Sequence, residues 1–363
     1  MIHVVIGTRA QLIKMVPIMR AFVDHEIEYN FVFLSQHVAT VKEILDQFGL
    51  KQPDYVVAHR SNDVVTALQM IAWSLRALLE GFRRRGLIFR GDKSGCVLVH
   101  GDAPPVLLGA LLAKAQGLQV AQIEAGLRSH DFFRPFPEEI TRYAVGRAGL
   151  IDLHFCQDQR ALETAQHYPG TAFHTHGNTI VDTVELAFKE SSKIDEEPGF
   201  ALVSLHRFEL LRSRARLQWV SELLGELAER KRIIFILHPP TESALKRYKL
   251  FEKLEAHGNL TLSPRKPFIE FQQLLAAADF VISDGGSNQE ECAFLGIPCL
   301  ILRECSERED GFGENIVLSK FCRAEIDSFV ENPERYRTPR QEDRLSPTKI
   351  ILRELEKRGL VDP

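Results

Sequence analysis

Short apolar segments alternate with longer amphipathic segments along the chain, and this alternation restricts the fold more than any single motif does. The apolar segments lie at residues 2–6, 29–34, 97–99, 120–123, 151–156, 200–205, 233–237, 260–262, 280–283 and 297–302. Strands separated by helices run parallel, because each connection carries the chain back to the end of the sheet where the previous strand began. We therefore expect an α/β fold with doubly wound parallel sheets.

The length of the chain indicates two domains. A chain of 363 residues is too long for one core of ordinary size. Residues 191–199, SSKIDEEPG, have the composition of a linker, and a second series of strands and helices begins beyond them. We expect two Rossmann-like domains facing each other across a cleft, at residues 1–178 and 179–345. The amphipathic C-terminal helix, within residues 346–363, is expected to pack back on the first domain.

Composition argues against several classes of partner. The 45 Lys and Arg residues are offset by 49 Asp and Glu residues with no long block of either sign, which argues against a nucleic-acid-binding surface. We expect no membrane span, because no run of about eighteen uncharged apolar residues is present. The six cysteines lack C-x-x-C spacing and the N-terminus lacks a signal-peptide pattern, so we expect reduced thiols and a cytoplasmic location.

Residues 64–82 form a long amphipathic segment in the first half of the chain. Leu68, Ile71, Leu75 and Leu78 recur there at helical spacing. We expect one helix whose apolar side packs in the core of the first domain.

Three carboxylates and two arginines are concentrated in residues 97–142. Asp102 and Glu124 each follow a strand-like run, and Glu138 opens a helix after two prolines. The carboxyl ends of parallel strands meet at one edge of a sheet, where ligands of open α/β sheets bind. Any one of these acids alone is equally well explained as a helix cap. Together with Arg128 and Arg142, they favour a proton-transfer site, in which neighbouring acids take different protonation states.

Two glycine turns between a strand and a helix predict anion sites. The first is Gly7-Thr8-Arg9, with Lys14 one turn into the helix; it lacks the further glycines of a dinucleotide fingerprint. In the second, GGSNQEE at residues 285–291, backbone N–H groups can hold a diphosphate, with Ser287 or Asn288 capping the helix. Read alone, the second motif is slightly better explained as an ordinary turn.

Residues near the second turn favour the functional interpretation. His206 and His238 each follow a strand directly, Glu291 suits ribose hydroxyls, and Arg308 suits phosphate. We expect no metal, because no His and carboxylate pair has the spacing of a helical metal site.

With these motifs in order, the chain resembles the non-hydrolysing UDP-N-acetylglucosamine 2-epimerase family over nearly its whole length. The motifs are GTRAQLIK, VLVHGD, IEAGLRS, FPEEITR, GNTIVD, SLHRFE, ISDGGSNQEE and RECSER. The resemblance implies the GT-B arrangement of two Rossmann domains. It also implies catalytic roles for Asp102, Glu124, Glu138 and His206, supported by Arg142. The positions that it implies for UDP or its diphosphate are Arg9, Lys14, His238, Phe271, Gly285, Gly286, Ser287, Glu291 and Arg308. Arg128, Asn178 and Arg207 complete the candidate substrate-binding set.

Several positions depart from the usual family pattern. Ala10-Gln11 replaces Pro-Glu of TRPE, and Ala103-Pro104-Pro105 stands where threonines commonly follow HGD. Gly285-Gly286-Ser287-Asn288 stands where the family turn reads SGGI, and Phe208 replaces the second basic residue of HRRE. These changes surround the sugar and phosphate contacts, so they bear on which sugar is bound more than on the reaction.

The resemblance implies epimerisation at C2 of a UDP-N-acetylhexosamine, most simply UDP-GlcNAc to UDP-ManNAc, for an envelope polysaccharide. In the family's mechanism UDP is eliminated to give a glycal and then adds back, with no cofactor. Which acid acts as base stays open, and a homodimer is expected. The alternatives are a hydrolysing epimerase that releases ManNAc and UDP, an epimerase of a modified UDP-sugar, a GT-B glycosyltransferase, and a non-catalytic nucleotide-sugar sensor.

Overall fold

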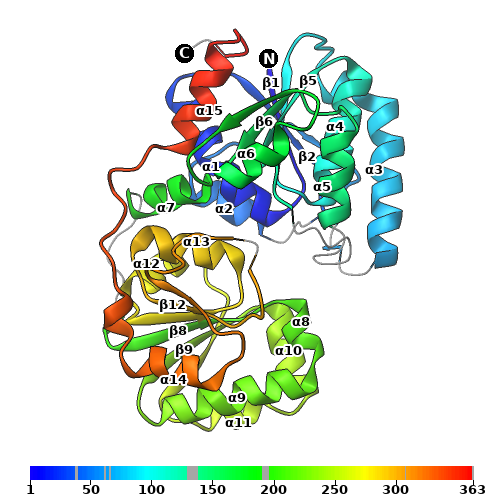
Figure 1. The fold of residues 1–363 in the computed structure, drawn as a ribbon. Helices are drawn as coiled ribbons and strands as arrows, with labels where there is room; N and C mark the ends of the chain where they lie inside the picture. The colour runs from blue at the N-terminus through cyan, green and yellow to red at the C-terminus, as the bar shows by residue number, and fades with distance from the viewer. Residues whose placement is uncertain are drawn as a thin grey trace. The chain divides into compact units, whose positions relative to one another are not determined.

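The chain forms two compact units in the computed structural model (Figure 1). The structure describes residues 1–36, 40–60, 63–64, 67–128, 138–189, 196–306 and 308–361. The first unit comprises residues 1–186 and 345–363, and the second comprises residues 187–344. The division falls after Leu186, inside α7 (Ile180–Lys189), rather than after residue 178, because residues 180–186 of this helix belong to the first unit. There the Thr183 hydroxyl donates a 2.8 Å hydrogen bond to the carbonyl of Ile13.

Among the described residues, the first unit holds a seven-stranded parallel sheet in the order β3-β2-β1-β4-β5-β6-β7. The strands are β1 (Ile2–Ile6), β2 (Tyr29–Phe33), β3 (Tyr55–Val56), β4 (Cys96–His100), β5 (Gln119–Ile123), β6 (Leu153–Cys156) and β7 (Thr171–His174). The helices are α1 (Arg9–Asp24), α2 (Val41–Gln47), α3 (Ala67–Ile88), α4 (Pro104–Gln116), α5 (Glu138–Arg147), α6 (Gln159–Ala165), α7 (Ile180–Lys189) and α15 (Pro347–Glu356).

The described part of the second unit holds a six-stranded parallel sheet in the order β10-β9-β8-β11-β12-β13. The strands are β8 (Phe200–Ser204), β9 (Arg232–Leu237), β10 (Leu260–Pro264), β11 (Phe280–Ser283), β12 (Cys299–Ile301) and β13 (Ile316–Leu318). The helices are α8 (Phe208–Arg212), α9 (Arg214–Ala228), α10 (Pro239–Arg247), α11 (Phe251–Glu255), α12 (Phe268–Ala277), α13 (Gly286–Leu295) and α14 (Arg323–Glu331), with a 3₁₀ turn at Pro333–Tyr336.

Each sheet is doubly wound, as the alternation of segments predicted. Strands β1, β2, β4 and β8 are buried along their whole length, which is the pattern of parallel strands covered by helices on both faces. The chain moves outward from β1 to β3 and then returns to place β4 on the other side of β1. The order reverses in the same way between β8 and β11. These two reversals mark where an open α/β sheet binds ligands.

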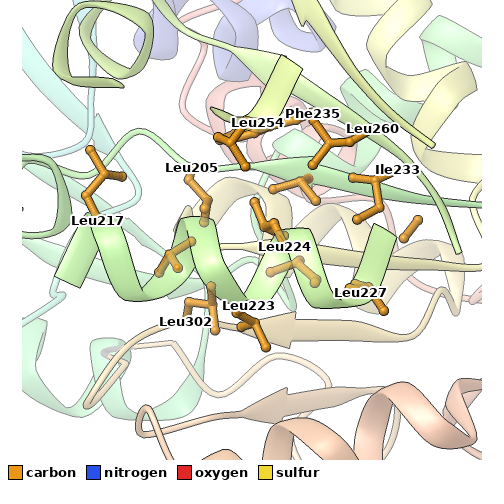
Figure 2. Close-up of a cluster of buried hydrophobic side chains, with 14 of the residues drawn as sticks. Leu205, Leu217, Leu223, Leu224, Leu227, Ile233, Phe235, Leu254, Leu260 and Leu302 are labelled. Carbon is orange, nitrogen blue, oxygen red and sulfur yellow. The ribbon is translucent and has the colours of Figure 1, made fainter. Parts of the chain in front are cut away.

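Leucines of α9 fill the core of the second unit (Figure 2). Leu223, Leu224 and Leu227 lie on the helix and pack with Ile233 and Phe235 of strand β9 in one buried cluster. The apolar side chains of this helix recur at helical spacing, so they form one stripe that covers the sheet.

The C-terminal helix α15 packs with α1 in the first unit. Asp182 of α7 stabilises the first turn of α15. One of its carboxylate oxygens accepts hydrogen bonds from the Ser346 hydroxyl at 3.0 Å and the Thr348 N–H at 2.8 Å. An acid at a helix N-terminus satisfies unpaired N–H groups and complements the helix dipole.

In the described part of the chain, no helix combines the length and apolar character that crossing a membrane requires.

The prediction that the apolar residues of the 64–82 segment pack in the core is wrong for three of the four residues on which it was based. Leu68, Ile71 and Leu75 are 80%, 58% and 57% exposed, whereas Leu78 packs beside the core. Helix α3 instead buries the side that carries Trp73. Hydrophobic periodicity identifies an apolar face but does not show what packs on that face. For a helix with two apolar faces, the sequence therefore does not show which face packs in the core.

A buried histidine connects the first two paired strands. His3 of β1 lies with its Nδ1 2.8 Å from the Asn30 amide nitrogen and its Nε2 3.1 Å from Asp92 Oδ2. The amide nitrogen can only donate, so Nδ1 accepts and Nε2 carries the proton toward Asp92. Burial lowers the pKa of His3, and the neighbouring Asp92 only partly opposes this effect. The fold therefore stabilises the neutral ring.

We predict that His3 makes the protein less stable as the pH falls below about 6.5. A pKa lowered in the folded state means that the unfolded chain takes up the proton first, so the stability present above pH 6.5 is lost as the pH falls through the folded pKa. We expect the free energy of unfolding, measured by urea unfolding between pH 7.5 and 5, to fall more steeply with decreasing pH in the parent than in His3→Gln. The two slopes should differ by up to about 1.4 kcal/mol per pH unit. Profiles that run parallel would contradict this assignment.

Candidate active site

The first unit gathers its candidate residues where β1, β4 and β5 end. Thr8 caps α1, and Gln11 completes a capping box by accepting the Gly7 and Thr8 N–H groups at 2.9 and 3.2 Å. The Gln11 amide also donates a 2.7 Å hydrogen bond to the carbonyl of His100 at the end of β4. A glutamate at this position has no N–H to donate, so Gln11 adds a link between α1 and β4.

Glu124 lies at the centre of the first cluster. Its Oε2 accepts hydrogen bonds from the Lys14 ammonium at 2.5 Å and from the Asn178 amide at 2.7 Å. The His100 ring Nε2 lies 3.5 Å from the same oxygen. The Asn178 amide nitrogen also donates to Gln157 Oε1 at 2.8 Å. The structure thus brings together three predicted residues, Lys14, Glu124 and Asn178, which come from distant parts of the sequence.

The backbone at Glu124 has left-handed geometry, with φ of 60°. This conformation is uncommon for a residue with a side chain, and such strain concentrates at functional sites. The Glu124 and Lys14 side chains are almost completely buried, so the charge of each is offset mainly by the other. The surrounding donors hold the carboxylate in one orientation.

Asp102 lies at the centre of the second cluster. Its Oδ2 accepts hydrogen bonds from Arg142 through Nε at 2.7 Å and Nη2 at 2.6 Å. Arg142 Nη1 also donates to the fully buried Glu139 at 3.3 Å, and Glu139 accepts a 2.5 Å bond from Arg128. Ala103, rather than Asp102, is the N-cap residue of α4. The capping alternative for Asp102 is therefore not realised, and its half-buried carboxylate is held by an arginine instead.

Two further predicted residues of the first unit, Arg9 and Glu138, lie at the first positions of helices. Arg9 is the first residue of α1, beside the Gly7 turn. Glu138 is the first residue of α5, and its side chain lies outside the described part of the chain.

In the second unit, Asp284 organises the turn that carries His206 and Arg207. The buried Asp284 carboxylate accepts the His206 N–H at 2.9 Å and the Arg207 N–H at 2.9 Å. The His206 Nδ1 lies 3.6 Å from Asp284 Oδ1, while the ring remains 39% exposed. Asp284 thus holds the side of the imidazole that carries Nδ1, while part of the ring stays accessible to solvent.

His238 is the second ring of this group. It is the N-cap residue of α10, and its ring centroid lies 4.7 Å from that of His206. Its Nε2 lies 3.4 Å from the Ser204 hydroxyl at the end of β8. A side chain at position 285 would place its Cβ 2.8 Å from His206 Cε1, so Gly285 permits the close approach of the imidazole.

Helix α13 begins earlier than the sequence indicated. Gly285 is its N-cap residue and makes no side-chain cap, so the prediction that Ser287 or Asn288 caps the helix is wrong. Asn288 instead accepts from the Ser283 hydroxyl at 2.9 Å and donates to Glu291 at 3.0 Å. The Asn288 side chain therefore joins the end of β11 to Glu291 on α13 instead of capping the helix.

Arg308 lies against the first turn of α13. Its guanidinium donates to the buried Glu290, and its backbone N–H donates to the Ser306 hydroxyl at 3.2 Å. A Cβ at Gly286 would lie 2.6 Å from Arg308 Nε, so glycine at this position lets the arginine side chain lie close to the helix backbone. Phe271 of α12 is partly buried and packs on the neighbouring apolar cluster.

Five residues that hold these groups were not among the predicted site residues: His100, Glu139, Gln157, Asp284 and Glu290. His100, Gln157 and Asp284 stand at or directly after the ends of β4, β6 and β11. The rule that singled out Asp102 and Glu124, a polar residue at the end of a strand, would have identified all three. Glu139 and Glu290 each adjoin a predicted glutamate, and only the direction of the side chain distinguishes the two neighbours.

Comparison with known proteins gives consistent matches. A family model described as UDP-N-acetylglucosamine 2-epimerase matches residues 21–347. The UDP-N-acetylglucosamine 2-epimerase of Methanococcus maripaludis is 30% identical over 332 residues, with 86% of this chain and 86% of that protein covered. The enzyme of the same name from Methanocaldococcus jannaschii is 29% identical over 337 residues, with 87% and 88% covered.

Solved structures resemble the chain over almost its full length. The Methanocaldococcus jannaschii UDP-GlcNAc 2-epimerase, solved in complex with UDP-GlcNAc and UDP, has a TM-score of 0.82 at 26% identity and covers 98% of this chain and 99% of its own. The UDP-GlcNAc 2-epimerase from Neisseria meningitidis, solved with UDP-GlcNAc, has a TM-score of 0.82 at 22% identity, with 98% and 99% covered. At that identity the second likeness concerns the fold alone.

We predict that Lys14→Met destabilises the protein by about 3 to 5 kcal/mol, because it leaves the Glu124 charge buried without its cation. Adding Glu124→Gln should recover part of this loss in a double-mutant cycle followed by urea unfolding. The control is Lys42→Met, which breaks the exposed Lys42–Asp46 pair and should change stability by less than about 1 kcal/mol. Equal effects of the two lysine variants would show that the buried pair has no special energetic role.

Proposed function

The chain belongs to the UDP-N-acetylglucosamine 2-epimerase family, and we propose that it inverts C2 of a UDP-N-acetylhexosamine, most simply converting UDP-GlcNAc to UDP-ManNAc. The observation that carries this proposal is the pair of carboxylates after β4 and β5, each held by a cation. We further propose that the product serves the synthesis of an envelope polysaccharide.

The proposed reaction consists of an elimination and its reversal. A carboxylate removes the C2 proton while the bond between C1 and the UDP oxygen breaks, which gives a glycal and free UDP. UDP then adds back to C1 while a proton is delivered to the opposite face of C2. We assign the two proton transfers to the set Asp102, Glu124 and Glu138, since carboxyl groups are effective general acids and bases when fixed within reach of the proton.

The cationic partners support this assignment physically. Lys14 and Arg142 hold the carboxylates of Glu124 and Asp102 at hydrogen-bond distance. Side chains held in place before the substrate arrives lose little entropy on reaching the reactive geometry. The buried Glu139 accepts hydrogen bonds from both Arg142 and Arg128, so Arg142 is itself held in place.

We propose that the second unit binds the UDP group. Helix α13 directs the N–H groups of its first turn toward the glycine turn, which suits a diphosphate. Arg308 lies at this turn, and the buried Glu291 lies one turn further on as the ribose partner. The exposed side of His206 serves the leaving phosphate or the sugar.

One observation favours a second candidate, the epimerisation of a modified UDP-N-acetylhexosamine. Phe208, which stands where the family has a basic residue, is strongly exposed at the start of α8, directly after His206-Arg207. The Arg212 guanidinium lies 3.8 Å from its ring centroid. An aromatic surface in place of a charge suits an apolar substituent on the sugar.

We also propose that the protein is a homodimer and acts in the cytoplasm. Support for the location comes from the cysteines, which are all free thiols, with Cys305 and Cys322 exposed. Exposed thiols persist in a reducing compartment, whereas secreted proteins tend to pair them.

We predict that the purified protein converts UDP-GlcNAc to a mixture of UDP-GlcNAc and UDP-ManNAc, observed by proton NMR at the anomeric signals. Release of ManNAc and UDP would identify the hydrolysing alternative. Asp102→Asn should lower turnover by about 10²-fold or more and leave UDP affinity nearly unchanged.

Arg308→Ala is the matched variant in the second unit. It should weaken UDP binding in calorimetry by roughly 1.5 to 3 kcal/mol, through loss of a charge-assisted contact. The proposal fails if UDP-GlcNAc is left unchanged, or if Asp102→Asn keeps full turnover.

A further inference from the structure

We propose that Tyr168 is a positioning residue for Asp102 and acts through the ion pairs that lie between them. The inference rests on the proposed function, because it gives Tyr168 a task in the proton transfers of that reaction. Tyr168 lies in the connection between α6 and β7, where no motif of the sequence marked it. Its task is to hold the first member of a chain of ionic contacts that ends at Asp102.

Charged side chains of alternating sign form this chain. Arg128 donates one hydrogen bond through Nη1 to the phenol oxygen of Tyr168 at 3.3 Å and another through Nε to Glu139 Oε1 at 2.5 Å. Arg142 donates to the second carboxylate oxygen of Glu139 at 3.3 Å. It also donates through Nε and Nη2 to Asp102 at 2.7 and 2.6 Å. Each contact uses different atoms of the shared side chains, so the chain is continuous from Tyr168 to Asp102.

The middle of the chain is shielded from water. The Glu139 side chain is fully buried, and the side chains of Arg142 and Arg128 are 8% and 12% exposed. Ionic contacts in such surroundings are screened little, and the hydrogen bonds of a connected network strengthen one another. A displacement of Arg128 is therefore passed on to Arg142 and Asp102 rather than compensated by solvent.

The surroundings of Tyr168 fix the position of its ring. The ring lies against α5, where a Cβ at Gly146 would be 2.4 Å from Tyr168 Cε2, so glycine permits this close approach. The Tyr168 N–H donates to the carbonyl of Ala165 at 3.0 Å, which joins it to the end of α6. The next carbonyl, of Pro169, accepts a 2.8 Å hydrogen bond from His154 Nε2 on β6. The phenol is thus presented in one orientation.

The Tyr168 hydroxyl limits the rotation of the Arg128 guanidinium. A guanidinium that is held at Nε alone can turn about that contact, whereas a second hydrogen bond at Nη1 fixes its plane. The Tyr143 ring centroid lies 5.4 Å from Arg128 Cζ and adds an attraction that is less directional than a hydrogen bond. Within the described part of the chain, Tyr168 therefore provides the second directional contact of Arg128, after Glu139.

The first test compares the turnover of UDP-GlcNAc in two variants that each lose one phenol hydroxyl. In Tyr168→Phe we expect kcat to fall roughly threefold to tenfold, the range that one hydrogen bond controls, while KM stays unchanged. The matched control is Tyr55→Phe, because the Tyr55 hydroxyl also accepts a hydrogen bond from an arginine, Arg84, at 3.2 Å. Tyr55 belongs to β3, outside the chain of contacts that ends at Asp102, so both constants should stay at the parent's values.

Calorimetric titration with UDP separates a loss of positioning from a loss of folded protein. The proposed UDP residues Glu291 and Arg308 belong to the second unit, so Tyr168→Phe should keep the parent's affinity for UDP and its number of UDP sites per chain. A kcat equal to the parent's would overturn the proposal. So would a fall in kcat that only matches a fall in the number of UDP sites.

A second measurement does not depend on the proposed reaction. It follows the exchange of the Arg142 Nε–H with solvent in ¹⁵N-labelled protein, with the signal assigned by means of Arg142→Lys. This N–H donates to Asp102, so its exchange reports how firmly the two side chains are held together. We expect exchange to be about threefold or more faster in Tyr168→Phe and unchanged in Tyr55→Phe.

Equal exchange rates in the parent and in Tyr168→Phe would overturn the positioning of Asp102 by Tyr168. Faster exchange in Tyr168→Phe, found with a parent that leaves UDP-GlcNAc unchanged, would support the positioning and overturn only the proposed reaction.

Discussion

The buried ion pair between Lys14 and Glu124 is the interaction on which the site of the first unit depends. It joins α1 to the end of β5, and the hydrogen bonds of Asn178 extend the connection to the segment that follows β7. Removing two opposite charges from water is costly, so a pair this deeply buried persists only where further hydrogen bonds complete it. Its presence fixes a carboxylate at the end of β5, the strand next to β4 and close to the reversal of strand order between β1 and β4, in a backbone conformation that an unconstrained glutamate avoids.

The second unit solves a related problem with a different arrangement. There a buried acid, Asp284, accepts backbone N–H groups and so orients His206 and Arg207 without engaging the front of the imidazole. The first unit thus presents carboxylates backed by cations, and the second presents cations and N–H groups backed by carboxylates. This contrast is consistent with the proposal that the first unit transfers protons and the second binds the diphosphate.

The sequence allowed prediction of the doubly wound sheets, the parallel strands and the gathering of several candidate residues at the strand ends, because polar residues there converge on one edge by topology alone. It did not allow prediction of how those residues pair. Lys14 was expected to hold phosphate, and its contact with Glu124 depends on the register of α1 against β5, which no local pattern encodes. The exposed face of α3 was misjudged for a similar reason, since a stripe of leucines has the same period whether its own core or another chain covers it.

In the proposed reaction, carboxyl groups of the first unit remove the C2 proton of the sugar and deliver a proton to C2. The most direct measurement is the hydrogen isotope at C2 after reaction with UDP-GlcNAc in D₂O, read by NMR and mass spectrometry of the recovered UDP-sugars. Deuterium at C2 of the product, with a rate that falls in Asp102→Asn, is the predicted result. A product sugar that stays fully protonated at C2 would contradict this mechanism, because the hydrogen delivered to the opposite face of C2 comes from a carboxyl group whose proton exchanges with D₂O.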